Sequence, residues 1–385
     1  MFRKTLPQNL ILTLICASVL VGAVFSQTLP PAEVTLSKCW SYPVADGVSR
    51  MAADGSGVFT AADGGKVEAI SLDGQQLWRA EFGWNLTSNI LVLDDNLYFA
   101  TAAPFGGDKG KSGGNTLRLL SRKTGIPTGQ AKLPDAATHF LGVYKDALIV
   151  VSSSGAIESF DARSLEVKWK REIAEGFVAE PRFLTDKIIV ASNAKQVFVV
   201  SLASGEIESL RKVPNNVTAV AQTSAGDLIV GDDRGNVTSL LGSTEKVNWK
   251  FRSGGEISSI FNVDDHILVT SHDNFAYSIA TRNGGLAWKR RFSGRIARIS
   301  TFQDKYAVIS GFDDHGAILT NLETGKVAGQ IALVDDESVI SSRVIASGLI
   351  VMLTNASVRA YGLDGCSDNK DGGPGKIARG RRQKN

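Results

Sequence analysis

The chain has 385 residues, with 42 Lys and Arg against 39 Asp and Glu and a net charge of +3 at pH 7. So small an excess of basic residues gives no whole-protein field that would attract a polyanion, so we expect no nucleic-acid partner. Length alone suggests two or three domains, but an internal repeat overrides that estimate and predicts one folded body.

The N-terminus has the pattern of an export signal. Arg3 and Lys4 precede an apolar run over residues 10–25, which is followed by small residues and a cleavage position before Gln27. The run is shorter than the roughly 20 residues that span a bilayer comfortably, so an uncleaved anchor is the weaker alternative. We therefore predict a signal peptide over residues 1–26, a linker over 27–37, and a periplasmic or envelope-associated protein.

We expect no lipid anchor at this end of the chain. Cys16 lies inside the apolar run, after Leu14 and Ile15, whereas bacterial lipidation signals place a small residue directly before the cysteine. Any contact with a membrane is therefore expected to be peripheral.

A four-strand unit recurs along the rest of the chain. Short apolar runs are separated by 39, 51, 40, 40, 39, 39 and 43 residues, and Gly/Asp turns lie between the strands of each unit. A constant period near forty residues is typical of a β-propeller in which each repeat is one blade. The runs begin at Val58, Leu97, Leu148, Ile188, Leu228, Ile267, Tyr306 and Leu349. The sequence therefore predicts an all-β fold, an eight-bladed propeller of four-stranded antiparallel blades over residues 38–366.

Tryptophan marks the fourth strand of several units, four residues beyond the preceding turn position. Large flat residues at equivalent blade positions are expected to fill the space between neighbouring blades. The residues with this pattern are Trp78, Trp169, Trp249 and Trp288.

The ends of the repeat predict how the ring closes. The last unit stops without a fourth strand, while residues 38–44 read as an orphan fourth strand with Trp40 at the tryptophan position. In repeat register, Cys39 and Cys366 fall near one bend, and an exported protein meets an oxidising compartment. We predict closure by the N-terminal strand and a Cys39–Cys366 disulfide.

The 51-residue interval holds the one conspicuous insertion, residues 104–114. Phe105 stands where a phosphate-binding loop would need glycine, and the segment joins two strands rather than a strand and a helix, so nucleotide binding is not expected. Long loops on rigid scaffolds often contact partners. Phe105, Lys109 and Lys111 are the candidate partner residues, and a plain surface loop is the alternative.

Signals for chemistry are weak elsewhere. The four histidines do not pair with carboxylates or cysteines at ligand spacing, and the chain has neither a CxxC nor a GxSxG motif. We expect no catalytic, cofactor or metal site. The last ten residues hold five basic side chains and no acid, after a Gly/Pro-rich stretch, so residues 367–385 are predicted to be a solvated, disordered tail. Contact of this tail with anionic lipid, cell-wall polymer or nucleic acid is the alternative.

The repeat resembles that of the pyrroloquinoline-quinone-like propellers. The likeness is seen in the motif Gly65-Lys66-Val67-Glu68-Ala69, followed by Gly74 and Trp78, and it extends over residues 38–366. The resemblance implies the propeller fold. The superfamily includes both quinoprotein dehydrogenases and a non-catalytic scaffold of bacterial outer-membrane β-barrel assembly. The dehydrogenases are similar to this chain in repeat only, because they are typically much longer and many have adjacent cysteines, which this sequence lacks.

We therefore expect an exported, non-enzymatic and monomeric scaffold without cofactor. Its partners would be proteins, such as a β-barrel assembly component. A quinone-binding oxidoreductase-like propeller and a carbohydrate- or cell-wall-binding module remain alternatives.

Overall fold

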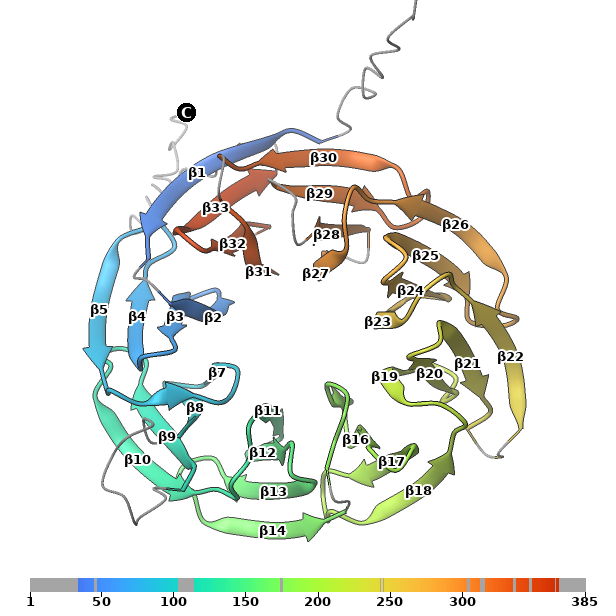
Figure 1. Ribbon diagram of the computed structural model, residues 1–385. Coiled ribbons are helices and arrows are strands. Elements are labelled where there is room, and N and C mark those ends of the chain that lie inside the picture. The colour runs from blue at the N-terminus through green and yellow to red at the C-terminus, as the bar shows by residue number, and fades with distance from the viewer. Residues whose placement is uncertain are drawn as a thin grey trace, which may run out of the picture. The chain divides into compact units, whose positions relative to one another are not determined.

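Eight antiparallel sheets are arranged around a ring, as the computed structural model shows (Figure 1). It describes residues 34–44, 47–102, 114–173, 176–242, 244, 246–302, 305–311, 316–334, 337–345, 348–363 and 365–366. The predicted eight-bladed propeller is confirmed. The predicted signal peptide, the predicted tail, most of the linker and most of the insertion lie outside the described residues.

Each blade contributes its first strand to the centre of the ring and its fourth to the outer wall (Figure 1). Blade 1 is β2 (Val48–Asp54), β3 (Gly57–Ala62), β4 (Lys66–Ile70) and β5 (Gln76–Glu81). Blade 2 is β6 (Asn85–Leu86), β7 (Leu91–Leu93), β8 (Asn96–Ala102), β9 (Thr116–Ser121) and β10 (Pro127–Lys132), with its first strand split in two. Blade 3 is β11 (His139–Tyr144), β12 (Ala147–Ser152), β13 (Ala156–Asp161) and β14 (Val167–Glu172). Blade 4 is β15 (Arg182–Phe183), β16 (Lys187–Ser192), β17 (Gln196–Ser201) and β18 (Ile207–Lys212).

The second half of the ring repeats this order. Blade 5 is β19 (Val217–Gln222), β20 (Leu228–Asp232), β21 (Asn236–Leu240) and β22 (Val247–Arg252). Blade 6 is β23 (Ile257–Val263), β24 (His266–Ser271), β25 (Phe275–Ala280) and β26 (Leu286–Arg291). Blade 7 is β27 (Ile296–Phe302), β28 (Tyr306–Gly311), β29 (Gly316–Asn321) and β30 (Val327–Ala332). Blade 8 is β31 (Val339–Val344), β32 (Ile350–Thr354), β33 (Ser357–Leu363) and β1 (Leu36–Pro43).

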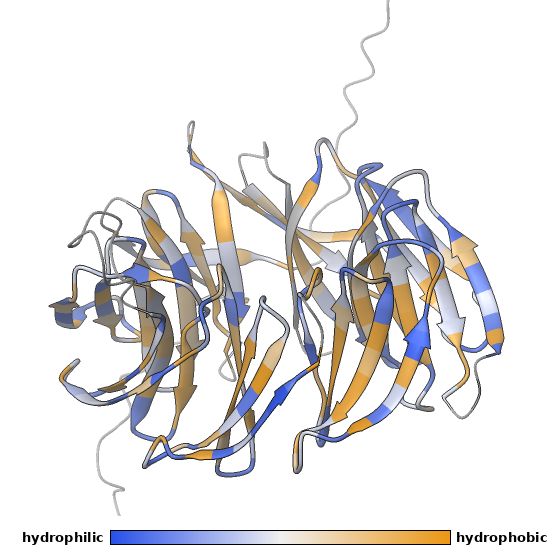
Figure 2. Cartoon of the chain, turned by 60° about the horizontal axis from the view of Figure 1, so that its bottom comes forward, coloured by the Kyte–Doolittle hydropathy of each residue, from blue (hydrophilic) through white to orange (hydrophobic). Residues whose placement is uncertain are grey.

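Burial follows the order of strands within a blade. Second strands such as β12 are buried along their whole length, because both of their faces meet neighbouring blades, whereas the outermost strand β14 is mostly exposed. Hydrophobic residues accordingly gather in the inner and middle strands, and hydrophilic residues in the outer ones (Figure 2). The core is thus a circular series of interfaces between blades rather than a single centre.

The N-terminal strand closes the ring. β1 pairs antiparallel with β33, from Leu36 opposite Leu363 to Pro43 opposite Ser357. The strand begins two residues before the expected boundary at position 38. The pairing covers the edge of β33, which would otherwise present unpaired N–H and C=O groups for edge-to-edge aggregation.

The turns of the blades define two faces of the ring. Because strands within a blade are antiparallel, second-to-third-strand turns lie on one face together with the connections between blades. Turns between first and second strands, and between third and fourth strands, lie on the opposite face. The insertion between β8 and β9 belongs to the first of these, which we call the insertion face.

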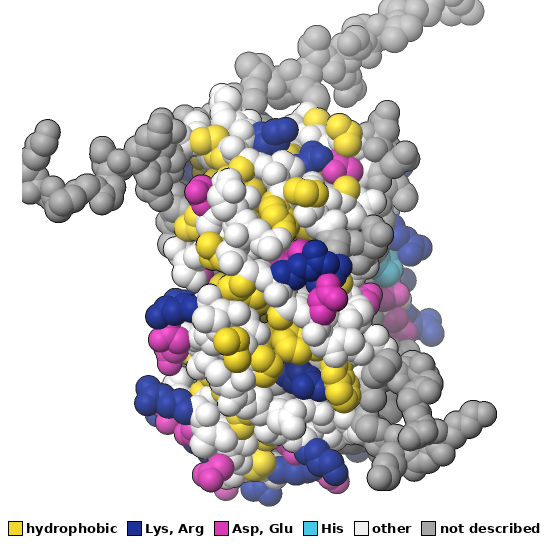
Figure 3. Space-filling model, turned by 90° about the vertical axis from the view of Figure 1, so that its left-hand side faces the viewer, with side chains coloured by type: hydrophobic (Ala, Val, Ile, Leu, Met, Phe, Trp, Pro, Cys, Tyr) yellow, Lys and Arg dark blue, Asp and Glu magenta, His cyan; other side chains and the backbone are white. Residues whose placement is uncertain are grey.

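The outer wall is chemically mixed. Figure 3 shows hydrophobic, basic and acidic side chains interspersed over the side of the ring that carries β5 and β10. Exposed apolar residues such as Leu77 and Ile126 are distributed over several blades. None of the described residues forms a helix long and apolar enough to cross a membrane.

Candidate binding site

Aromatic side chains of the outermost strands fill gaps between blades. The Trp78 indole lies against the third-to-fourth-strand turn of blade 2, where a Cβ atom placed on Gly125 would be 2.5 Å from the ring. Gly125 has a φ of +70°, a conformation that glycine adopts without steric cost, so both the turn and the ring require glycine here. Four other pairs of blades are joined in the same way. They are Trp40 with Gly74, Trp169 with Gly205, Trp249 with Gly284, and Trp288 with Gly325.

Backbone carbonyls of the turns fix four of these indoles. The Nε1 atom of Trp249, for example, donates to the carbonyl oxygen of Thr281 at 2.6 Å. Leaving a buried indole N–H without an acceptor would lower the stability of the fold by about 1 to 3 kcal/mol. The position of the carbonyl therefore determines how deep the ring lies and how it is tilted. The equivalent bonds run from Trp40 to Leu72, from Trp78 to Arg122 and from Trp288 to Leu322, at 2.6, 2.7 and 2.8 Å.

Two interfaces use the opposite combination of side chains. In blade 2 the tryptophan position holds Gly129, and the turn position of blade 3 holds Leu165 instead of glycine. A Cβ atom placed on Gly129 would lie 3.3 Å from the Leu165 side chain, which is buried at that interface. Between blades 7 and 8, a Cβ atom placed on Gly329 would likewise lie 3.3 Å from the Leu36 side chain. Leucine from one blade thus fills the space that tryptophan from the other blade fills elsewhere.

Among the described residues, the interface between blades 4 and 5 has neither filling. Ser209 occupies the tryptophan position of β18, opposite Val199 of β17, just as Trp169 lies opposite Ser159 in blade 3. A pocket of about 150 Å³ opens beside it. Its lining includes Val199, Leu228, Leu241, Gly226 and Gly242.

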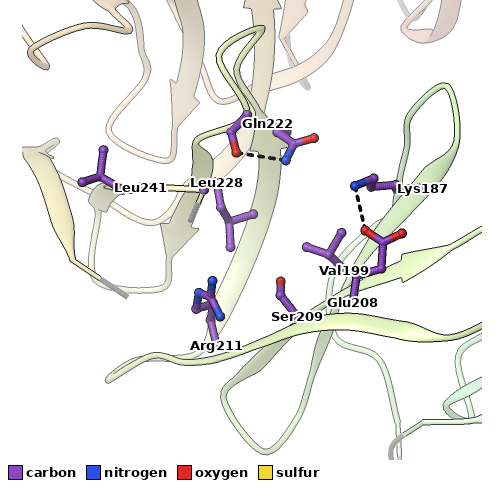
Figure 4. A pocket seen from close by; sticks show the side chains of 10 residues that line it. Lys187, Val199, Glu208, Ser209, Arg211, Gln222, Leu228 and Leu241 are labelled. Atoms are coloured by element: carbon purple, nitrogen blue, oxygen red, sulfur yellow. Dashed lines mark hydrogen bonds and ion pairs between the residues drawn. The ribbon is translucent and has the colours of Figure 1, made fainter. Parts of the chain in front are cut away.

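Charged and amide groups surround this pocket (Figure 4). Lys187 Nζ lies 2.7 Å from a carboxylate oxygen of Glu208, and this pairing raises the pKa of Lys187. The Gln222 side-chain amide donates to the Gly226 carbonyl at 3.0 Å. Arg211 extends along the side of the pocket next to Ser209 (Figure 4).

The base of the insertion forms a second, separate site on the insertion face. The guanidinium of Arg118, on β9, lies 4.4 Å from the centre of the half-buried Trp84 ring, and its Nε donates to Thr101 Oγ1 at 2.8 Å. Burial lowers the pKa of Arg118. Asn115 donates to the Ala136 carbonyl at 2.6 Å, so the end of the insertion is tied to the connection that leads to blade 3. The candidate partner residues Phe105, Lys109 and Lys111 lie outside the described residues.

A disulfide joins Cys39 of β1 to Cys366, with Cα atoms 5.3 Å apart. The register of β1 against β33 shifts between Lys38 and Trp40, so Cys39 is the bulged residue of the strand. A bulge leaves its residue outside the regular ladder, which frees the Cys39 side chain to reach the end of the chain. Within the described part of the chain, no three His, Cys, Asp or Glu residues are grouped to hold a metal ion.

Comparison with known proteins agrees with the repeat pattern. A family model described as outer membrane protein assembly factor BamB matches residues 208–357. The BamB of Shewanella oneidensis is 23% identical over 343 residues, which cover 81% of this chain and 85% of that protein. The BamB of Burkholderia pseudomallei is 24% identical over 218 residues, which cover 54% of this chain and 57% of that protein.

Solved structures share the architecture. The crystal structure of BamB from Moraxella catarrhalis matches with a TM-score of 0.63 and 15% identity, covering 85% of this chain and 98% of that one. The chain is a BamB-like propeller of PQQ-type repeats. The computationally designed Ika8 protein and the C-terminal WD40 domain of Sif2 both match with a TM-score of 0.70, at 14% and 11% identity, and show the fold alone.

The residues singled out in the sequence occupy distinct parts of this BamB-like propeller. The five tryptophans lie at blade interfaces, and the two cysteines lie at the closure of the ring. Sequence reasoning missed the Trp84–Arg118 stack, because Trp84 falls outside the repeat pattern. It also missed Ser209, although aligning the position four residues beyond each turn would have revealed a missing aromatic residue there.

Proposed function

We propose that the chain is an exported, non-enzymatic scaffold that takes part in the assembly of outer-membrane β-barrel proteins. The observation that carries this proposal is the similarity to a BamB over 81% of the chain. The export pattern of residues 1–26 agrees with a periplasmic or envelope location. Processing before Gln27 would leave the protein without a lipid anchor and in peripheral contact with the membrane at most.

The insertion face is the proposed partner surface. It carries the stacked pair of Trp84 and Arg118, two residue types that are enriched among the dominant residues of protein interfaces. The stack is held by the Thr101 hydrogen bond and stands beside the insertion that carries Phe105, Lys109 and Lys111. A rigid platform next to a long loop suits recognition of another protein by a monomeric propeller.

Site-specific photo-crosslinking in the native envelope tests this proposal. A photoreactive amino acid is placed at the exposed positions Ser154 and Ala194, in second-to-third-strand turns on the insertion face. Matched controls carry it at Lys145 and Arg163, exposed turn residues of the opposite face. Mass spectrometry then identifies the captured proteins and the N-terminal residue of the chain itself.

We expect the insertion-face positions to capture a β-barrel assembly component, with processed Gln27 at the N-terminus. Replacing residues 104–113 with a Gly/Ser linker of equal length should abolish the crosslink while leaving cooperative unfolding intact. Capture of wall polymer or a redox partner, with no assembly component from any position, would overturn the proposal and favour the two alternative functions.

A further inference from the structure

We infer that the pocket at Ser209 binds the indole of a tryptophan side chain presented by a partner polypeptide. The inference does not depend on which partner the insertion face engages. Its basis is internal to the molecule, because the same position between other blades receives an indole from the chain itself. Five of the eight blade interfaces contain such a tryptophan, and two contain leucine in its place.

The acceptor for an indole N–H is preserved at this interface. In blade 2, Ser121 N–H donates to the Ile126 carbonyl across the turn, and the next carbonyl, that of Arg122, accepts the Trp78 indole. In blade 5, Leu241 N–H donates to the Lys246 carbonyl in the same way. Gly242 therefore stands in the acceptor position, and it lines the pocket.

The size and walls of the pocket suit an aromatic ring. Its volume of about 150 Å³ is comparable to that of a protein cavity that takes up benzene, about 150 Å³. Val199 and Leu228 supply apolar walls, and the Arg211 side chain lies beside the space where it can stack on a ring face (Figure 4). At five other interfaces the indole enters from the outermost strand of the same chain. At this interface the strand supplies a serine, and the space beside it is left for a side chain from another molecule.

Titration of the folded, isotope-labelled protein with N-acetyltryptophanamide tests the inference. We expect saturable amide shifts in two-dimensional NMR spectra at Ser209, Gly226, Leu228 and Gly242. The 1-methylindole analogue cannot donate a hydrogen bond and should bind about tenfold more weakly. N-acetylleucinamide should also bind about tenfold more weakly, because it lacks both the ring and the donor.

Two substitutions provide matched controls. Ser209→Trp should fill the pocket from within, abolish the shifts caused by the probe, and leave the melting temperature equal or higher. Ser209→Ala should retain binding, because the hydroxyl is not part of the proposed contact. Ser209→Phe is a smaller filling that serves the same purpose if the tryptophan variant does not fold.

The outcomes separate the occupants. Saturable binding that the filling variant abolishes supports the inference. An absence of saturable shifts in the wild-type protein up to the solubility limit of the probe would overturn it, as would equal binding by the wild-type and filling variants. Equal binding of the leucine and tryptophan amides would show an unspecific apolar pocket and would also overturn it.

Discussion

Gly129 and Leu165 are complementary across the interface of blades 2 and 3, since the leucine occupies the space that a tryptophan at position 129 would need. A Cβ atom on Gly129 would lie 3.3 Å from the Leu165 side chain. Leu165 also has a φ of +58°, which is costly for a residue other than glycine. The turn at Leu165 is therefore strained, and the same leucine fills the space between the two blades.

This relationship predicts a strong coupling between the two positions. Gly129→Trp alone should lower the free energy of unfolding by roughly 1 to 3 kcal/mol, because the new ring overlaps Leu165. Adding Leu165→Gly should recover much of that loss, because it recreates the tryptophan and glycine pair found at five other interfaces. Urea unfolding of the four members of this double-mutant cycle measures the coupling, and strictly additive effects would contradict it.

Trp249→Ala should lower the free energy of unfolding by roughly 3 to 5 kcal/mol, because it removes a buried indole and leaves a cavity. It also removes the 2.6 Å hydrogen bond to Thr281. Leu286→Ala, at an exposed position of the next blade, is the control and should change stability little. Equal losses for the two variants would show that the indole does not hold the blades together.

Removing the Cys39–Cys366 disulfide should destabilise the ring closure. The bond closes a loop across 327 residues, which the chain-entropy model values at up to roughly 5 kcal/mol. The double variant Cys39→Ser/Cys366→Ser should melt at a lower temperature and show faster hydrogen exchange in β1. Ser154→Ala, at an exposed turn, is the control and should unfold like the wild-type protein. Unchanged exchange in β1 after loss of the bond would be the contrary result.

Stability should fall as the pH is lowered from 7.5 to 5, through the buried His139. Its Nε2 lies 3.1 Å from the Pro134 carbonyl, which can only accept, so Nε2 donates there and Nδ1 accepts from the Thr87 hydroxyl at 3.0 Å. Burial lowers the pKa of His139 in the folded state. The unfolded chain therefore binds a proton first, near pH 6.5, and the stability contributed by the neutral ring is lost below that pH.

Urea unfolding at several pH values in this range measures how the free energy of unfolding depends on pH. That dependence should be weaker for His139→Asn than for the wild-type protein. Burial raises the pKa of Glu158, whose contribution has the opposite sign because the folded state then holds its proton more tightly. Glu158→Gln should therefore make the free energy of unfolding fall more steeply as the pH is lowered. Identical slopes in the wild-type and His139→Asn proteins would contradict the assignment.

The fold was largely predictable because it depends on a period. Apolar runs such as those at Val58 and Leu97 recur with each blade, since each blade must bury the same two faces against its neighbours. The orphan strand around Trp40 was predictable for the same reason, because a ring with an incomplete last blade requires one more strand.

The candidate sites were less accessible from sequence. The filling of an interface depends on pairs such as Gly129 and Leu165 that lie in different repeats, and a single repeat does not reveal which neighbour it meets. The stacking of Arg118 on Trp84 depends on side-chain geometry beside the insertion. Such contacts leave no periodic signal.

The pairing of β1 with β33 also determines when the fold can be completed. The N-terminal strand is synthesised first, and its partner arrives only after almost all the intervening blades have been made. Joining contacts so distant in sequence is slow, because the loop-closure entropy must be overcome first. A polypeptide cut short before residue 357 would leave β1 without a partner and the ring open. Only a full-length chain can therefore close the ring. A truncated chain would leave strand edges exposed to the proteases and chaperones of the cell.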